Sequence, residues 1–462
     1  MVGSTYKHSV GVSQLSLHVE FRCAATAKLT LKFLIDGMVT VSSSILRLSF
    51  CFVLLAGLAG CGKNSAIGSS GNPNIVTYTF NGNNMPVTVA TQIGAGAYTQ
   101  ATLTSNKLIL SIPDGETNYS VAFLCPSPTA GPFVNEEYIN QASLLDGTAF
   151  SETCYQLPLQ GGTATAEVDA SAIPGAEEIN VGSGSGCSAC DTFNGSAFLA
   201  VGTYDVPVTV DGNGGPYSPP LAARILRNQT IPGALNGGAP VVLKTTDETV
   251  PQTITYSNVP NGYSPVGRTV VYNTAGGASV QLELNNSGPQ LTQYVAMPSG
   301  TYQSGDYYDF LVSASGTTSG PSVSVETYTS SAGPQSFTFP PPWSYAGPTA
   351  AALPTFNFAY AGFPGMSDIS YQATINWGLG TWVFGIAADL DEIYISATAN
   401  YQNGSTAISI PDLSSLTGFL ATPPSGTTVG WSAAVYQGDP FLTSPPSGTI
   451  QGADNSGSYT EP

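Results

Sequence analysis

Short runs of alternating apolar and polar residues, broken by turn-forming residues, dominate the chain from about residue 76 onward. Examples are residues 76–80, 107–112 and 322–328. Alternation with a period of two places successive side chains on opposite faces of a strand, whereas an amphipathic helix repeats every three to four residues. Gly, Pro, Asn and Asp interrupt the runs at intervals typical of sandwiches. The sequence therefore predicts an all-β protein made of tandem β-sandwich modules.

The composition supports a β protein with an unusually uncharged surface. Charged residues make up only 9% of the 462 residues, against roughly 25% in ordinary soluble domains. The apolar residues alternate with Ser, Thr and Asn and do not cluster into long blocks. The 23 Tyr and 19 Phe residues argue against disorder, because disordered segments are poor in aromatic residues.

An apolar stretch near the amino terminus has the features of an export signal. Arg47 supplies a positive charge, and residues 48–60 form an apolar run of 13 residues. This run is shorter than the roughly 20 residues that a spanning helix needs, and it fits the core of a signal peptide. Residues 38–60 are therefore predicted to be a signal peptide.

The end of this stretch, Leu58-Ala59-Gly60-Cys61, resembles the lipobox of bacterial lipoproteins. The resemblance implies that the Cys61 thiol carries a diacylglycerol and that the chain is cut before it. Two or more acyl chains would give a stable membrane anchor. Gly62 stands where an Asp commonly retains such proteins in the inner membrane, so the resemblance favours the outer membrane. The alternative is an internal buried helix in which Cys61 is an ordinary thiol.

Residues 1–37 precede a signal that should begin close to the start of translation, and Met38 stands at the expected position. We expect residues 1–37 to be an untranslated or disordered extension. Residues 61–75, which are small and polar, are expected to form a flexible tether behind the anchor.

Removal of the signal leaves a strongly acidic chain without histidine. Six basic and 27 acidic residues follow Cys61, a net charge of −21. Nucleic acid is therefore excluded as a partner, because binding to phosphates draws on several cationic contacts. His8 and His18 both precede Cys61. Ser-His-Asp catalysis, Cys-His catalysis and His-ligated metal sites are excluded with them.

A short motif suggests modular construction. An apolar residue, Pro, a variable residue and Gly recur at 112–115, 259–262 and 297–300, each followed closely by a tyrosine (Tyr119, Tyr263 and Tyr302). The pattern predicts a strand, a tight turn with Gly at positive φ, and a strand whose Tyr packs inward. It is similar to the turn-and-Tyr feature of transthyretin-like and carboxypeptidase-regulatory-like β modules, which implies Ig-like or prealbumin-like sandwiches; chance recurrence in a Pro/Gly-rich β protein is the alternative.

Two Gly-rich or Pro-rich breaks divide the mature chain, at 182–186 and from 340 to about 354. We expect three β modules, at 76–182, 192–338 and 355–447. The tail from Gly448 onward is polar, and we expect it to be frayed.

Four cysteines remain after Cys61, namely Cys125, Cys154, Cys187 and Cys190. An even number in an exported chain predicts two disulfides. We favour Cys125–Cys154 and Cys187–Cys190, because the members of each pair share a module or a loop. A zinc site of four thiolates and a redox role for the second pair are the alternatives.

The third module contains the residues most open to a functional interpretation. Asp389, Asp391 and Glu392 could supply a carboxylate pair for glycoside hydrolysis, or could bind Ca²⁺. Asp389 and Asp391 are two residues apart in an expected strand, so they should lie on one face. An aromatic platform on which sugars stack could be formed by Trp377, Trp382, Tyr394, Tyr401 and Trp431. The alternatives are a solvated strand end for the carboxylates and core packing for the indoles.

These features favour an exported, lipid-anchored envelope protein with a non-catalytic structural or binding role. Its expected partners are the membrane, through the lipid, and an envelope polysaccharide or protein. No cofactor or metal is expected. A carboxylate-based glycan hydrolase or a Ca²⁺-dependent carbohydrate-binding protein is the alternative.

Overall fold

The structure is a computed structural model that describes residues 18–22, 28–32, 74–81, 85–125, 134–154, 161–182, 185–212, 219–284, 293–316, 320–363, 369–378, 390–438 and 448–462. The chain divides into two compact units, 1–52 and 53–462. Two antiparallel strands, β1 (His18–Arg22) and β2 (Lys28–Lys32), lie in the first unit. The signal segment and Cys61 lie outside the described residues, so their roles stay predictions. Within the described residues, no helix is long and apolar enough to span a bilayer.

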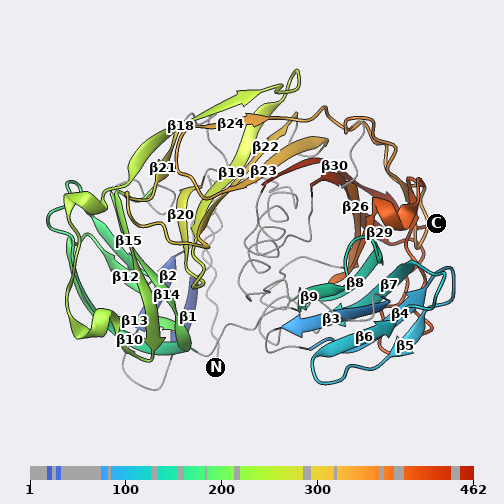
Figure 1. The fold of residues 1–462 in the computed structure, drawn as a ribbon, viewed down its shortest axis with the longest axis horizontal. Coiled ribbons are helices and arrows are strands. Elements are labelled where there is room, and N and C mark those ends of the chain that lie inside the picture. Colours follow the sequence, from blue (N-terminus) through green and yellow to red (C-terminus); the bar gives the residue numbers. More distant parts are fainter. Residues whose placement is uncertain are drawn as a thin grey trace, which may run out of the picture. The chain divides into compact units, whose positions relative to one another are not determined.

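A twelve-stranded sheet organises the second unit (Figure 1). Its strands, in spatial order, are β20 (Ser279–Leu284), β19 (Ser264–Asn273), β22 (Tyr307–Ser315), β23 (Ser322–Thr329), β30 (Gly448–Thr460), β29 (Thr428–Gln437), β26 (Ile369–Gly378), β27 (Leu390–Thr398), β8 (Val134–Ser143), β7 (Asn118–Cys125), β4 (Thr88–Ile93) and β5 (Thr99–Ala101). Every neighbouring pair is antiparallel except β27 and β8, which run parallel. The prediction of an all-β sandwich architecture is confirmed.

The predicted alternation is visible strand by strand. Along β6 (Lys107–Ser111), Leu108 and Leu110 are buried while the residues between them are exposed. Along β27, Ile393, Ile395 and Ala397 are buried, and the residues that alternate with them are half-buried. In these strands the period-two pattern therefore separates a core face from a more polar face.

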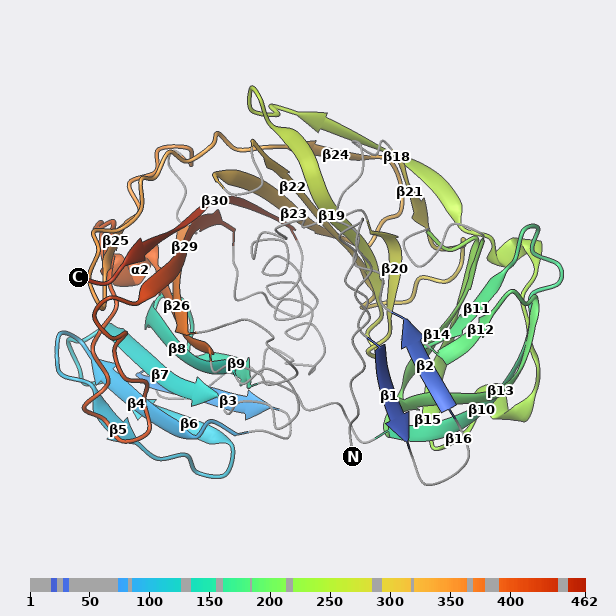
Figure 2. The ribbon, with the colours of Figure 1, turned by 180° about the vertical axis from the view of Figure 1, so that it is seen from behind.

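A small sheet covers one end of the long sheet and makes the first sandwich (Figure 2). It consists of β6, β3 (Ile75–Asn81) and β9 (Ala149–Thr153), with β3 in the middle. Tyr78 and Phe80 of β3 pack with Tyr119 and Phe123 of β7 in one buried cluster. Aromatic rings dominate this core, and the Phe80 and Phe123 rings meet edge to face with centroids 5.2 Å apart.

A second sandwich forms from two four-stranded sheets. One contains β12 (Ser185–Ser188), β11 (Glu178–Val181), β14 (Gly202–Asp211) and β15 (Ala222–Ile231); the other contains β13 (Thr192–Ala200), β10 (Gly161–Asp169), β16 (Gly233–Ala234) and β17 (Val241–Val242). Small and β-branched residues from both sheets share one core, among them Ala164, Val168, Val206 and Val208. Such side chains allow two sheets to pack closely.

The largest core lies on the apolar face of the long sheet. Two further elements contribute to it: the sheet of β21 (Gln293–Ala296), β18 (Val250–Ser257) and β24 (Gln335–Thr338), and the pair β25 (Thr355–Asn357) and β28 (Ala407–Ser409). Phe310 of the long sheet meets Tyr294 of β21 edge to face at 5.0 Å. Phe356 and Trp431 make a similar contact, with centroids 6.5 Å apart. The remaining elements are the short helix α2 (Ala399–Gln402) and the 3₁₀ turns η1 (Leu235–Gly238) and η2 (Thr245–Asp247).

The expectation of a frayed tail is wrong. Strand β30 begins at Gly448 and pairs with β23 on one side and with β29 on the other. Within the strand, Ile450 and Asn455 are 6% exposed and Ala453 is fully buried, so β30 is an interior strand of the sheet. Because β30 lies between β23 and β29, strands from all three expected modules belong to a single sheet.

The repeated turn motif is confirmed for its glycines and only partly for its tyrosines. Gly115, Gly262 and Gly300 all adopt φ between 81° and 93°, which only glycine does at little cost. Tyr119 is fully buried, as predicted, but Tyr302 is 44% exposed. The conformation of a turn depends on its own residues and can be predicted from the sequence. The burial of the tyrosine that follows depends on which sheet packs against its strand.

Candidate functional site

The described carboxylates predicted in the third module lie on β27, next to β8. Asp391 and Glu392 are consecutive, so they point to opposite faces of the sheet. Asn135 of β8 donates a hydrogen bond from Nδ2 to Asp391 Oδ1 at 2.8 Å. Asp389 and Trp382 lie outside the described residues, so the predicted pairing of Asp389 with Asp391 on one face stays a prediction.

Glu392 belongs to a row of acidic and aromatic side chains that crosses three strands. It stands in register with Glu136 of β8. One step along the strands, the rings of Tyr394 and Tyr138 stack at 4.9 Å with 9° between their planes, and Phe123 stacks on Tyr138 at 5.2 Å. This row was not predicted, because it depends on the parallel pairing of β27 with a strand about 250 residues earlier.

Burial within this row raises the pKa of Glu136. The residue is only 8% exposed. Burial raises its pKa above the ordinary value, although a 2.8 Å hydrogen bond donated by the Tyr138 hydroxyl to Oε2 acts in the opposite direction. Glu152 of β9, which accepts a hydrogen bond from Asn140 at 2.9 Å, has its pKa raised by burial to about 7.

Trp377 lies in the core of the protein. Its side chain is 5% exposed and belongs to the large cluster on the apolar face of the long sheet. Trp431 is equally buried, and Tyr345 meets its ring edge to face. Both indoles therefore contribute to packing, the alternative that the sequence left open.

A shallow hollow lies on the same side of β27 as Ile393. Glu137, Leu413 and Leu420 contribute to its lining, and the space inside does not admit a water molecule. Glu137 accepts a 3.0 Å hydrogen bond from the Leu420 backbone N–H, and burial raises its pKa to about 7. The hollow is a contact between β8 and the segment that follows β28, with no volume for a ligand.

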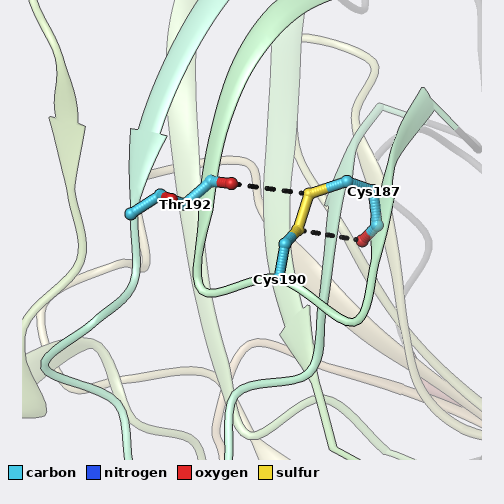
Figure 3. Close-up of a disulfide and its surroundings, with 3 residues drawn as sticks. All are labelled: Cys187, Cys190 and Thr192. Atoms are coloured by element: carbon cyan, nitrogen blue, oxygen red, sulfur yellow. Dashed lines mark hydrogen bonds between the residues drawn. A yellow bond between two sulfur atoms is a disulfide. The ribbon is translucent and has the colours of Figure 1, made fainter.

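The two predicted cysteine pairs lie at disulfide distance. Cys125 and Cys154 join the two sheets of the first sandwich, with Cα atoms 5.2 Å apart, and each is 1% exposed. Cys187 lies in β12, and Cys190 follows three residues later; both are half-buried (Figure 3). Cys187 Sγ lies 3.6 Å from the carbonyl oxygen of Thr192, and Cys190 Sγ lies 3.3 Å from that of Cys187. The four cysteines do not form one zinc site, because Cys125 and Cys154 belong to the core of the first sandwich, whereas Cys187 and Cys190 pack against that of the second. The redox role stays a prediction, since a disulfide is also the oxidised form of a redox-active pair.

An arginine-centred ion network joins the second sandwich to the long sheet. Arg227 of β15 donates from Nη1 to Asp205 Oδ2 at 2.8 Å and from Nη2 to Asp306 Oδ2 at 2.7 Å. Asp306 also accepts hydrogen bonds from the Tyr272 hydroxyl and from two backbone N–H groups. Burial alone would raise the pKa of Asp306, but the hydrogen bonds from Arg227 and Tyr272 outweigh it and hold the pKa below its ordinary value.

A second acidic pair lies three residues further along. Asp309 of β22 and Glu326 of β23 are hydrogen-bonding neighbours, and Glu326 also accepts a hydrogen bond from the Tyr328 hydroxyl. No sequence signal identified this pair, because each acid occupies an ordinary polar position of an alternating strand.

The described residues contain no group of three or more His, Cys, Asp or Glu side chains placed to hold a metal ion. Searches with the sequence found no matching family model and no matching curated protein. The site must therefore be interpreted from its own chemistry.

Proposed function

We propose that this chain is an exported lipoprotein of the bacterial cell envelope, anchored through a lipid on Cys61, with a non-catalytic structural or binding role. The observation that carries the proposal is the sequence Leu58-Ala59-Gly60-Cys61 at the end of a 13-residue apolar run. The absence of an Asp after Cys61 supports placement at the outer membrane. Its partners would be the membrane and an envelope polysaccharide or protein.

Two properties of the described region support this proposal. The Cys125–Cys154 pair suits an oxidising compartment outside the cytoplasm. Two carboxylates of this region already accept hydrogen bonds within the fold. Asn135 donates to Asp391, and the Tyr138 hydroxyl donates to Glu136. Side chains engaged in this way stabilise the sheet.

The test is metabolic labelling with an alkyne fatty acid in a bacterial host, followed by separation of membranes. We expect the wild-type chain to incorporate label and to sediment with membranes, and Cys61→Ala to do neither. Cys51→Ala is the matched control, since it changes a thiol in the same apolar run and should leave labelling unchanged. Labelling that survives in Cys61→Ala would contradict the proposal.

A second candidate function is glycan binding or hydrolysis, favoured by the neighbouring Glu136 and Glu392 and the stacked Tyr138 and Tyr394. Carboxylates on adjacent strands are close enough for glycosidase chemistry, and tyrosines commonly contact sugars. The soluble 62–462 fragment can be applied to a glycan array. Binding that Tyr394→Ala abolishes would support this candidate, and a blank array would remove it.

A further inference from the structure

Asp309 and Glu326 occupy neighbouring strands on one face of the long sheet. In the antiparallel pair β22–β23, Asp309 stands opposite Tyr328, and Leu311 stands opposite Glu326. Because residues two apart share a face, the two carboxyls are diagonal neighbours. Their side chains lie within hydrogen-bonding reach of each other.

A hydrogen bond between two carboxyl groups needs a proton. An ionised carboxylate can only accept hydrogen bonds, so two ionised groups in contact would repel each other. One member of the pair must therefore be protonated for the observed contact to be favourable.

Among the side chains that the structure describes, no cation pairs with either acid. The ion pairs among the described side chains involve Asp205, Asp247 and Asp306. The titratable groups that face the pair are tyrosines: Tyr307 on β22, Tyr328 on β23 and Tyr436 on β29, which pack with Ile450 of β30. Burial and the charges of both acids raise the pKa of Tyr307 and Tyr328 above the ordinary value, so these hydroxyls stay neutral.

Two buried polar atoms beside the pair have no hydrogen-bond partner. They are Asp309 Oδ1 and the hydroxyl of Tyr307, whose residue is 6% exposed. Asp309 as a residue is half-buried, but its Oδ1 atom is shielded from solvent. An ionised Asp309 would leave a charge on an unsatisfied atom, which costs far more than leaving a neutral carbonyl oxygen there.

We propose that Asp309 and Glu326 hold one proton between them at neutral pH, and that its release at higher pH makes the β22–β23 pairing a pH-sensitive element of the sheet. Burial raises the pKa of both groups, and the adjacent Glu326 carboxylate raises that of Asp309 further. The pair titrates as a unit, so its two steps belong to both residues.

The direction of the pH effect follows from these raised values. A carboxyl whose pKa is higher in the folded state contributes stability that is fully present below its unfolded pKa, near 4. That contribution is lost as the pH rises through the folded pKa. The pair should therefore weaken the sheet on the alkaline side and leave it intact in mild acid.

Infrared difference spectroscopy of the full chain tests the proton directly. At pH 7 we expect the pair to contribute a protonated-carboxyl C=O absorption beside those of other buried acids such as Glu137 and Glu152, whose pKa is about 7. Asp309→Asn should reduce the contribution of the pair, and Asp309→Asn/Glu326→Gln should remove it and leave the other absorptions in place. Asp169→Asn is the matched control, because it makes the same change at a carboxylate whose pKa hydrogen bonds from Ser171 hold below its ordinary value. It should leave the absorption unchanged.

Thermal unfolding provides the second readout. The melting temperature of the wild type should fall between pH 5 and pH 8, and Asp309→Asn should reduce that fall by a few degrees. Circular dichroism at pH 5 checks that the variants fold. If Asp309→Asn does not fold, Glu326→Gln replaces it in both measurements. An Asp309→Asn spectrum equal to that of the wild type at pH 7 would overturn the proposal. So would Ca²⁺ raising the melting temperature of the wild type at pH 8 but not that of Asp309→Asn, since the pair would then bind a cation.

Discussion

Two acidic clusters lie three residues apart at β22, and they differ in whether a cation reaches them. Asp306 lies against Arg227 and has a lowered pKa, whereas Asp309 lies against Glu326 and has a raised one. Asp306 is 2% exposed, and the Oδ1 atom of the half-buried Asp309 is shielded from solvent. In a chain with only six basic residues after Cys61, the position of one arginine decides which buried carboxylates are ionised.

The two clusters should therefore respond to pH in opposite directions. The stability that Asp306 contributes is present above its unfolded pKa of about 3.9 and is lost as the pH falls through its lower folded pKa. The stability at Asp309 and Glu326 is present below about pH 4 and is lost as the pH rises. We therefore expect these neighbouring residues to contribute opposite pH dependences to the stability of the fold.

The largest expected effect comes from removing the arginine. Arg227→Met leaves Asp205 and Asp306 buried without their cation, and should lower the free energy of unfolding by about 3–5 kcal/mol at neutral pH. The loss should shrink in mild acid, because the pKa of the orphaned Asp306 would rise and the group would take up a proton. Urea unfolding at pH 5 and pH 8 measures both.

Arg224→Met is the matched control for this change. Arg224 pairs with Asp247, but its side chain is 33% exposed, so we expect a loss of about 1 kcal/mol or less. Equal losses for the two variants would break the comparison, because they would show that burial of the pair at Arg227 has no energetic consequence.

The sequence predicted the parts of this molecule that depend on local chemistry. Alternation identified the strands, glycines at 115, 262 and 300 identified tight turns, and the sharing of a module or loop identified Cys125–Cys154 and Cys187–Cys190 as pairs. Each of these inferences uses residues that are close in sequence or share an obvious segment.

Long-range pairing is what the sequence could not supply. The row of Glu136, Glu392, Tyr138 and Tyr394 exists because β8 and β27 pair in parallel, and nothing local selects β27 as the partner of β8. The tail at 448–460 looks frayed because its Gly, Ser and Asn residues lack apolar alternation, yet two flanking strands supply its hydrogen bonds. Trp377 was compatible with either face until the register placed it in the core.

Asp306→Asn should have an intermediate effect. Asn keeps one acceptor oxygen for the several donors that converge on Asp306, so we expect a loss of about 2–3 kcal/mol at neutral pH. Because the variant has no carboxylate to protonate, its stability should fall less steeply between pH 5 and pH 2 than that of the wild type. An unchanged acid slope would show that Asp306 does not set the acid limit.

Tyr328→Phe should have the smallest effect of the series. It removes one hydrogen bond to Glu326, worth about 1 kcal/mol. Because that bond favours the ionised form of Glu326, its loss should also make the stability of the protein fall more steeply as the pH rises. Tyr307→Phe is the control, since its buried hydroxyl has no partner to lose. The comparison fails if Tyr307→Phe costs as much as Tyr328→Phe in thermal unfolding at pH 8.

The proposed role of the protein rests on Cys61, and the mature amino terminus tests it most directly. We predict that mass spectrometry of the protein purified from bacterial membranes finds an amino-terminal peptide that begins at Cys61 and carries a diacylglycerol, and finds no peptide from residues 1–60. An unmodified Cys61 inside a longer peptide would contradict the account.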